Sequence, residues 1–475
     1  MRDRYESPLC ERYASARMQY IFSPDFKFTS WRKMWLYLAE AEKELGLDIT
    51  DEQLDEIRAH LNDVDYDAAA AYEKCLRHDV MAHLRAFADQ CPKAGPILHL
   101  GATSCYVGDN TDVWQLSEAL KSLRGQLLGV MAALSDFALK NADVPTLAYT
   151  HFQAAQPTTV GKRATLWLQD FLMDFDRLTF ELSRLKPLGC KGTTGTGASF
   201  LMLFNGDEAK VRALEGLIAR KMGFESCVAV SGQTYTRKVD AFVLNVLSGI
   251  AQSASKMATD LRLLSHLKEF DEPFESEQVG SSAMAYKRNP MRSERVCSLA
   301  RYVMTDALNP AWTAATQWME RTLDDSANRR IALPEAFLAA DAILTLCRNL
   351  ISGGRVYSGV MRRHLNEEMP FMATENILMR AVELGGDRQK LHEKIREYSV
   401  ETAARVKLEG GENDLLDKLK ADPAFHLDDA ALAEILDVKQ FIGCAPSQTR
   451  AFVEEVVRPV LEACGTGDGT DEVRV

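Results

Sequence analysis

Apolar residues recur at steps of three and four along three long segments, the spacing that turns one face of an α-helix toward a core. The first segment begins at Val113 and continues through Leu116, Leu120, Leu123, Leu127, Val130, Leu134 and Phe137. The other two cover residues 167–185 and 239–264. Helices of this length exceed the usual mean of about 11–12 residues, so the pattern predicts a long-helix bundle. Alternation of the kind that marks strands is scarce.

The apolar stripes of these helices are broad, which bears on how many neighbours each helix has. They are wider than a coiled-coil seam and include small residues such as Gly125, Gly129 and Ala251. A broad stripe of this kind suits a helix that is packed on more than one side. We therefore expect partner helices from other subunits, and the alternative is a large monomeric bundle.

Two breaks in the helical pattern indicate where domains meet. The first is the stretch 95–110, after which Asn110 or Thr111 is the expected N-cap of the first long helix. The second is Ser-Gly-Gly-Arg at 352–355. They predict an all-α chain with an N-terminal helical domain at 1–103, a central long-helix domain at 104–356 and a C-terminal helical domain at 357–475. Residues 465–475, rich in Gly and Asp, are expected to fray.

Composition and charge narrow the class of protein. Of 475 residues, 46% are hydrophobic and 26% charged, which is typical of a soluble globular protein. The net charge of −12 argues against nucleic acid or an anionic membrane as the main partner, because both attract Lys and Arg. The N-terminal residues lack the apolar run of a signal peptide, and no stretch reaches about 18 apolar residues. We therefore expect a cytoplasmic protein without a membrane span.

The cysteines bear on redox compartment and metal binding. All ten are far apart, and none forms a C-x-x-C pair. No His/Cys cluster has the spacing of zinc ligands. We interpret the cysteines as reduced core thiols and expect no metal site.

The most unusual stretch is residues 280–290, with the sequence GSSAMAYKRNP. It places two hydroxyls, two cations and an amide in one predicted loop. This loop lies between an acidic segment at 269–277 and a helix that begins near Pro290. Taken alone, the same composition is equally consistent with a flexible surface loop.

The loop is similar to the S-S-x-M-P-x-K-x-N signature of the fumarase/aspartase superfamily, whose members eliminate fumarate from succinyl compounds through a carbanion. Other segments that match are Arg-His-Asp at 77–79, His-Leu-Gly-Ala-Thr-Ser at 99–104, Thr-His-Phe-Gln at 150–153, Lys-Gly-Thr-Thr-Gly-Thr at 191–196 and residues 321–330. Together they resemble the animal-like branch of the adenylosuccinate lyase family, from about Arg12 to beyond Asn413. An argininosuccinate lyase fits 77–79 and 321–330 less well, and a catalytically silent relative would not need the reactive side chains.

This resemblance implies a three-domain, all-α fold whose long helices form the core of a homotetramer, with each active site built from three subunits. It also implies elimination of fumarate from adenylosuccinate, giving AMP, and from the succinyl-carboxamide ribotide SAICAR, giving AICAR. These nucleotides are the expected partners, with no nucleic acid and no membrane. Because elimination needs no redox step and metal-ligand spacing is missing, no cofactor is expected.

Such an elimination requires a base, stabilisation of a doubly charged aci-carboxylate and an acid for the departing nitrogen. By the resemblance, Ser281 is the base that removes the Cβ proton, acting as an alkoxide stabilised by Lys287 and backbone N–H groups. Ser282 stays open as an alternative base. His151 is the acid, since imidazole titrates near neutrality. His78 is a second active-site imidazole that either binds phosphate or supports the acid.

The substrate carries a phosphate and two carboxylates, so it needs several cationic or N–H-rich contacts. By the resemblance, the contacts to the nucleotide and its phosphate are Arg12, Tyr13, Arg321, Ser326 and Arg330. The contacts to the succinyl part and its surroundings are Thr103, Ser104, Gln233, Lys287, Asn289 and Arg295. Arg77 and Asp79 complete the expected site, with Asp79 either orienting His78 or pairing with Arg77.

Several neighbouring residues have a plainer interpretation. Arg329 and Arg330 are also consistent with a solvated helix face. Asp324 and Asp325 fit a salt-bridging surface and are left out of the site. The glycines at 192–197 lack the spacing of a phosphate-binding P-loop and either let the backbone pass close to substrate or form a tight turn.

Both catalytic loops depart from the family pattern at one position. The prolines usual in the two loops are Ala154 and Ala285 here. Each change removes a fixed φ from its loop. We expect weaker preorganisation of the two loops, with the reacting side chains retained.

Overall fold

The computed structural model describes residues 3–275, 277–278, 283–284 and 286–465. Within these ranges the chain is mostly helical, with two short antiparallel sheets of two strands each. The all-α class predicted from the apolar spacing is therefore confirmed. The expected base Ser281, the alternative Ser282, Ala285 and residues 466–475 of the tail expected to fray lie outside the described residues.

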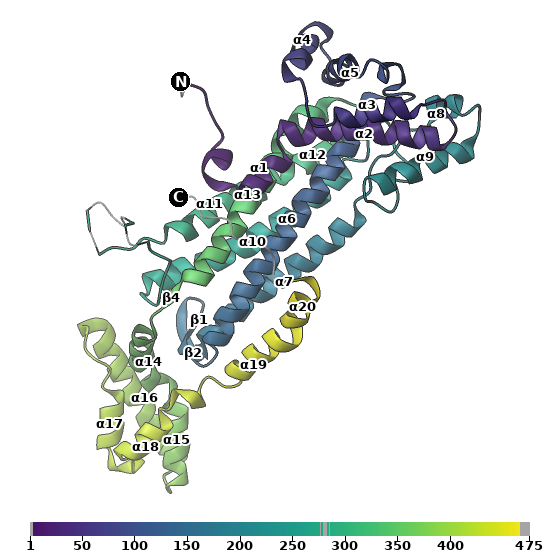
Figure 1. The fold of residues 1–475 in the computed structure, drawn as a ribbon. Coiled ribbons are helices and arrows are strands. Elements are labelled where there is room, and N and C mark those ends of the chain that lie inside the picture. Colours follow the sequence, from purple (N-terminus) through teal and green to yellow (C-terminus); the bar gives the residue numbers. More distant parts are fainter. Residues whose placement is uncertain (1–2, 276, 279–282, 285, 466–475) are drawn as a thin grey trace.

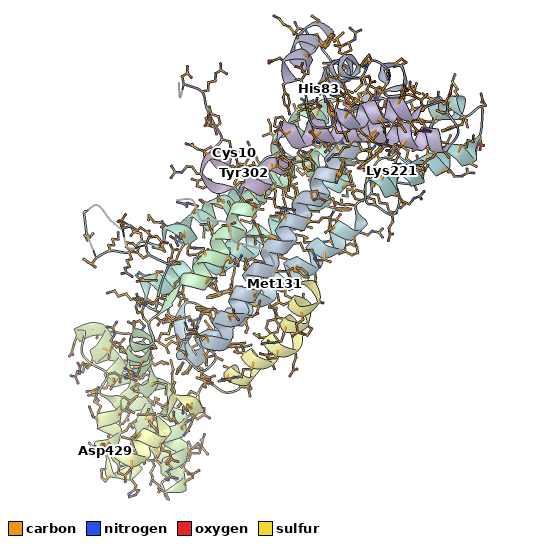
Figure 2. The ribbon with its side chains drawn as sticks, in the orientation of Figure 1. Cys10, His83, Met131, Lys221, Tyr302 and Asp429 are labelled. Carbon is orange, nitrogen blue, oxygen red and sulfur yellow. The ribbon has the colours of Figure 1, made fainter. Side chains whose placement is uncertain are left out.

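Helices, most of them long, run side by side through the middle of the molecule (Figure 1). They are α6 (Ser104–Lys140), α7 (Val160–Arg184), α10 (Lys238–His266), α11 (Met291–Asp306), α12 (Leu308–Thr316) and α13 (Asp324–Gly353). The three apolar stripes predicted from sequence lie on α6, α7 and α10. Their inward residues form one continuous core, in which Met131 of α6 is fully buried (Figure 2).

Helix α6 begins earlier than its apolar pattern indicates. Its N-cap is Thr103, so the expectation of Asn110 or Thr111 is wrong, and both of these lie buried inside the helix. Asn110 Nδ2 donates to the backbone oxygens of Tyr106 (2.7 Å) and Gly189 (3.2 Å), and its Oδ1 accepts from Gly189 N–H (2.9 Å). The amide therefore binds the helix to a neighbouring segment instead of capping a helix end.

The N-terminal helices lie across one end of this bundle (Figure 1). They are α1 (Ala16–Ile21), α2 (Pro24–Glu44), α3 (Asp51–Ala59), α4 (Tyr66–Leu76) and α5 (Asp79–Gln90), with α8 (Ala198–Leu203) and α9 (Glu208–Lys221) from later in the chain. Ser23 caps α2 by accepting from the N–H of Phe26, and Pro24 takes the first helical position. Trp35, Phe87 and Phe200 are buried in the shared core of these helices.

A β-hairpin that the apolar pattern does not reveal follows α6. Strands β1 (Pro145–Thr150) and β2 (Gln153–Thr159) pair antiparallel, and His151 and Phe152 form the two-residue turn between them. Both turn residues have left-handed φ values, 53° and 57°. Two-residue turns of this kind favour Asn-Gly, so the bulky pair holds strained backbone of the sort found at functional sites.

The C-terminal part forms a smaller helical body beyond the other end of the bundle (Figure 1). Strands β3 (Phe270–Asp271) and β4 (Arg355–Val356) precede α14 (Ser358–Met372), α15 (Thr374–Glu383), α16 (Arg388–Ala404), α17 (Leu415–Ala421) and α18 (Asp429–Ile435). Helices α19 (Ala445–Ala451) and α20 (Arg458–Cys464) then return along the bundle, where they contact α7 and α6. No helix in the described ranges is long and apolar enough to cross a membrane.

Candidate active site

A cavity of about 520 Å³ lies where the N-terminal helices meet the start of α6. Its wall comes from α2, the α4–α5 junction, the first turns of α6 and the start of α13. The predicted site residues that line it are Arg77, His78, Asp79, Ser104, Arg321, Ser326 and Arg330. The fold thus brings three distant motifs of the sequence to one cavity.

The α4–α5 junction presents His78 and Asp79 to the cavity. Arg77 ends α4 in a left-handed conformation (φ 53°), and His78 becomes the N-cap of α5, its Nδ1 accepting from Met81 N–H at 3.4 Å. Asp79 Oδ2 accepts from Arg330 Nη2 at 3.1 Å, and its Oδ1 lies 3.8 Å from His78 Nδ1. The sequence offers His78 and Arg77 as alternative partners of Asp79. The structure places Asp79 beside His78, and the arginine that pairs with Asp79 is Arg330 and not Arg77.

The first turn of α6 brings backbone donors to the cavity wall. Thr103, the N-cap, makes no side-chain capping bond, and Ser104 and Cys105 line the cavity. The free N–H groups and the positive end of the helix dipole favour an anion at this position. Gln233 lies next to this turn, because its Oε1 accepts from Cys105 Sγ at 3.5 Å.

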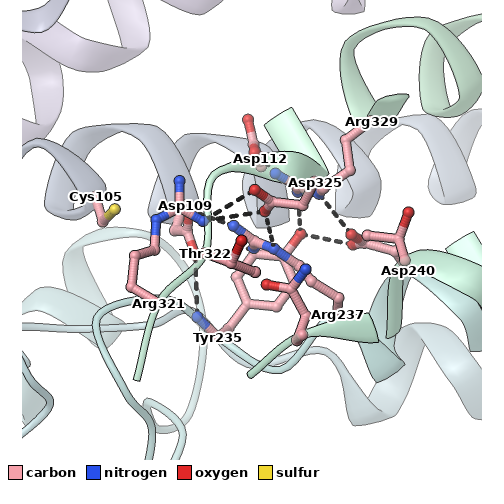
Figure 3. Close-up of polar contacts among 12 residues, drawn as sticks. Cys105, Asp109, Asp112, Tyr235, Arg237, Asp240, Arg321, Thr322, Asp325 and Arg329 are labelled. Atoms are coloured by element: carbon pink, nitrogen blue, oxygen red, sulfur yellow. Dashed lines mark hydrogen bonds and ion pairs between the residues drawn. The ribbon is translucent and has the colours of Figure 1, made fainter. Parts of the chain in front are cut away.

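The cavity wall is supported by a buried network of arginines and aspartates (Figure 3). Arg237 donates twice to Asp109, at 3.0 and 3.2 Å, and once to Asp325, at 2.7 Å. Arg321 donates to both oxygens of Asp325, at 3.0 and 3.2 Å. Asp325 is 1% exposed, so its interpretation as a surface residue is wrong. Its carboxylate holds the two guanidiniums in place.

Arg329 extends this network (Figure 3). Its Nε donates to Asp240 at 2.6 Å and its Nη2 to Tyr235 Oη at 2.6 Å, while Asp112 Oδ2 lies 2.9 Å from the same Nη2. Tyr235 in turn donates its hydroxyl to Asp240 at 2.6 Å. Arg329 is 8% exposed, so a solvated helix face is the wrong interpretation for it, whereas Arg330 next to it is exposed.

Burial and charge pairing together set the protonation of the network. Burial raises the pKa of Asp109, although the Arg237 guanidinium opposes this shift. Burial acts to lower the pKa of Arg237 and of Arg329, but Asp109 and Asp240, respectively, hold these pKa values above the ordinary range. The guanidiniums therefore stay charged inside the protein.

The other predicted substrate contacts lie away from this cavity in the same chain. Arg295 of α11 stacks over the Tyr13 ring, 5.4 Å from its centroid, and Arg12 lies beside Tyr13 in the short π-helical turn Leu9–Tyr13. Lys287 is exposed, and Asn289 precedes α11. None of these residues belongs to the wall of the cavity that holds His78.

His151 lies in the hairpin that follows the far end of α6 from the cavity. With 37 residues, α6 is about 55 Å long, and it separates Ser104 in the cavity wall from the hairpin. The eleven residues from Asn141 to His151 can bring the chain back by at most about 36 Å. His151 and Ser104 of the same chain are therefore at least about 18 Å apart, and Figure 1 shows the hairpin beside the end of α6 that lies away from α4 and α5, so one small substrate does not reach both.

Two glutamates that the sequence pattern does not single out hold the segments next to the predicted catalytic loops. Glu269 is fully buried, with Oε1 2.8 Å from His364 Nδ1 and Oε2 accepting from a threonine hydroxyl of β1 at 3.5 Å. Glu272 accepts from the backbone N–H groups of Arg292 and Ser293, at 2.9 and 2.7 Å, in the first turn of α11. Glu269 therefore connects β1 to α14, and Glu272 connects the segment that precedes residues 280–290 to the start of α11.

Comparison with protein families matches most of the chain. Residues 23–305 match the family described as Lyase, and residues 370–452 match Adenylosuccinate lyase C-terminus. An adenylosuccinate lyase from Saccharomyces cerevisiae is 50% identical to this chain, over 97% of this chain and 96% of its own length. One from Schizosaccharomyces pombe is 49% identical, over 96% of this chain and 95% of its own length. An adenylosuccinate lyase from Schistosoma mansoni is 48% identical, over 97% of this chain and 96% of its own.

Solved structures share the fold at lower identity. A 3-carboxy-cis,cis-muconate lactonizing enzyme from Pseudomonas putida has a TM-score of 0.80 and 23% identity, covering 94% of this chain and 98% of its own. A fumarate lyase from Mesorhizobium sp. BNC1 has a TM-score of 0.78 and 22% identity, covering 95% of this chain and 99% of its own. At these identities the likeness concerns the fold alone.

Proposed function

The chain belongs to the adenylosuccinate lyase family. We propose that it catalyses the β-elimination of fumarate, and that each active site is built from residues of several chains. Adenylosuccinate is split into AMP and fumarate, and SAICAR into AICAR and fumarate. Both substrates present a succinyl-amino group and a phosphoribosyl group, so one site serves both. The enzyme is a C–N lyase of purine nucleotide synthesis.

Each step of the elimination has a proposed residue. Ser281, as an alkoxide, takes the proton from Cβ, and the electron pair left behind is delocalised into an aci-carboxylate that Lys287 stabilises. This electron pair then forms the C=C bond of fumarate as the Cα–N bond breaks. His151 donates its proton to the departing nitrogen, so the amine leaves in neutral form. No oxidant or reductant takes part.

The distance between His151 and the cavity is the observation that carries the shared site. In one chain the cavity holds His78, Arg321 and Arg330, whereas the hairpin that carries His151 follows the far end of α6. A reaction that uses both His78 and His151 on one substrate therefore requires the hairpin of a second chain. Residues 280–290, which follow α10 in the sequence, are the proposed contribution of a third chain.

The cavity suits the nucleotide end of the substrate. Arg321, Ser326 and Arg330 line it together with the N-terminus of α6, and all of these favour a phosphate. His78 adds a further donor at the same wall.

Surface and cysteine features support a homotetramer in the cytoplasm. Leu166, Met173 and Phe180 of α7 recur every seven residues and are 48%, 64% and 53% exposed in the single chain. An apolar stripe of this kind is typical of a helix that packs against another chain. All ten cysteines are free, which fits a reducing compartment.

Subunit mixing tests both the reaction and the shared site. Purified wild-type protein should release fumarate from adenylosuccinate and from SAICAR, and His78→Ala and His151→Ala should each be nearly inactive. When the two variants are unfolded, mixed one to one and refolded, about a quarter of the sites receive both intact histidines by random assembly. We therefore expect about a quarter of wild-type activity in the mixture.

A matched pair of variants provides the control. His78→Ala and Arg330→Ala remove two residues of the same cavity in the same chain, so mixing them should restore no activity. Equal recovery in both mixtures, or none in either, would contradict the shared site. Absence of fumarate release by the wild-type protein would contradict the proposed reaction itself.

A further inference from the structure

The cationic side chains of the cavity differ in whether a carboxylate already binds them. The cavity is lined by Lys27, Arg77, Arg237, Arg321, Arg329 and Arg330. Four of these are held in ion pairs: Arg237 and Arg321 with Asp325, Arg329 with Asp240 and Arg330 with Asp79. Lys27 and Arg77 are the two cations of the cavity wall that form no ion pair with a carboxylate of the described residues. An anion bound beside these two does not have to displace an existing partner.

Lys27 is fixed in the wall by aromatic contacts. It lies in the first turn of α2, half-buried, with its Nζ 5.1 Å from the ring centroid of Trp31 and 5.5 Å from that of Phe28. Trp31 is itself buried, so it gives the lysine stem a rigid surface. Burial lowers the pKa of Lys27 and Arg330 adds to this shift, whereas the carboxylates of Asp112, Asp79 and Glu73 oppose it. None of these three carboxylates forms an ion pair with Lys27 among the described residues, so the ammonium has room for a closer anionic partner.

We propose that Lys27 is a further substrate-binding residue, whose ammonium binds the 5′-phosphate of the nucleotide. The inference rests on the proposed function, since it assigns one more contact of the same site. A phosphate monoester carries about −1.5 to −2 charges at neutral pH, so it needs more compensation than a carboxylate does. Lysine supplies this as a point charge without a fixed hydrogen-bond geometry.

The surroundings favour the phosphate over the succinyl carboxylates as the group that Lys27 binds. Three of the five residues expected at the nucleotide and its phosphate, Arg321, Ser326 and Arg330, share the cavity with Lys27. Of the six residues expected at the succinyl part, Ser104 alone lines it, and Lys287 and Asn289 do not. The one cavity carboxylate without an ion pair among the described residues is Glu73, which is exposed and screened by water.

Substitution of Lys27 by methionine removes the charge and keeps an unbranched stem over Trp31. We expect KM for adenylosuccinate, and the inhibition constant of AMP, to rise about tenfold to a hundredfold, the range for a lost charged hydrogen bond. The kcat should stay within about twofold, since substrate and transition state lose the same contact. The inhibition constant of fumarate should not change, because fumarate has no phosphate.

Two further variants separate this role from a structural one. Lys27→Arg retains the charge and should restore KM to within a few-fold of wild type. Lys33→Met on the same helix removes a lysine whose Nζ lies 5.6 Å from the ring centroid of Trp114 and that is outside the cavity wall, so its KM should match wild type. The salt dependence of AMP binding should weaken in Lys27→Met alone.

The possible results are distinct. If wild-type protein releases fumarate and Lys27→Met keeps KM and AMP inhibition within about twofold, Lys27 does not bind phosphate and the proposed reaction stands. An equal rise in the AMP and fumarate inhibition constants would also overturn the assignment, since it indicates a general distortion of the site. If wild-type protein shows no fumarate release, the failure belongs to the proposed function, and calorimetric titration of AMP into both proteins decides the role of Lys27 independently.

Discussion

Replacing Asp325 by asparagine preserves the size of the side chain but removes the charge that faces two guanidiniums. The carboxylate accepts from Arg237 Nε at 2.7 Å and from Arg321 Nη1 at 3.0 Å, and it is 1% exposed. An amide in its place turns an NH₂ group toward one guanidinium and leaves a buried cation short of its counter-ion. Breaking a buried ion pair at one partner costs about 3–5 kcal/mol, so we expect the free energy of unfolding to fall by about 3 kcal/mol.

Urea unfolding followed by circular dichroism measures this loss. All samples must have one protein concentration, because subunit association contributes to apparent stability. The matched control is Asp324→Asn, since Asp324 is exposed and accepts hydrogen bonds from Thr322 at 3.2 Å and Gln317 at 3.3 Å. We expect the control to change stability by about 0.5 kcal/mol or less. Equal urea midpoints for the two variants would refute the view that this network supports the cavity wall.

Two other substitutions test features outside the cavity. Glu42 is fully buried, neither carboxylate oxygen has a hydrogen-bond partner among the described residues, and burial raises its pKa to about 8. The unfolded chain releases this proton above about pH 4.3, so stability falls as pH rises from there through pH 8. We expect Glu42→Gln to raise the free energy of unfolding at pH 8 and much less at pH 5, and an equal gain at both pH values would contradict this. Gly195 has φ 84°, and a Cβ there would lie 1.9 Å from the backbone oxygen of Ser231, whereas Gly206 has φ 85° and open space around it. Gly195→Ala should therefore prevent stable folding, while Gly206→Ala should lower the free energy of unfolding by about 1–2 kcal/mol because of its left-handed backbone. Similar melting temperatures for the two variants would show that the close approach of Gly195 to the Ser231 backbone is unimportant.

The long helices could be predicted because their stability comes from a repeating apolar face that the sequence displays directly. The hairpin after α6 could not, since its turn uses His151 and Phe152 in place of the usual Asn-Gly, and its strands alternate weakly. The start of α6 was misplaced for a related reason. Asn110 is a good capping residue by type, but its amide is committed to the backbone of Gly189, which only the tertiary structure brings near.

The motifs identified the segments that form the cavity, but not the charges that support it. Asp324 and Asp325 are neighbours in sequence and point about 100° apart on a helix, so one meets solvent and the other the core. Sequence alone does not say which. A usable signal was present in α6, where Asp109 and Asp112 stand three residues apart among apolar positions. Charges so placed in a core helix need buried partners, and Arg237 and Arg329 are these partners.

Helix α6 carries cavity residues at its start and is followed by the hairpin of His151 at its end. Inserting one residue into α6 shifts everything after it by 1.5 Å and rotates it by about 100°, and a full turn shifts it by about 5.4 Å. In an assembly that combines the hairpin of one chain with the cavity of another, the general acid would then miss the substrate. The length of α6 thus sets the distance between the hairpin and the cavity. Insertions and deletions within α6 should therefore reduce activity more than substitutions do, including substitutions that change the size or charge of a side chain.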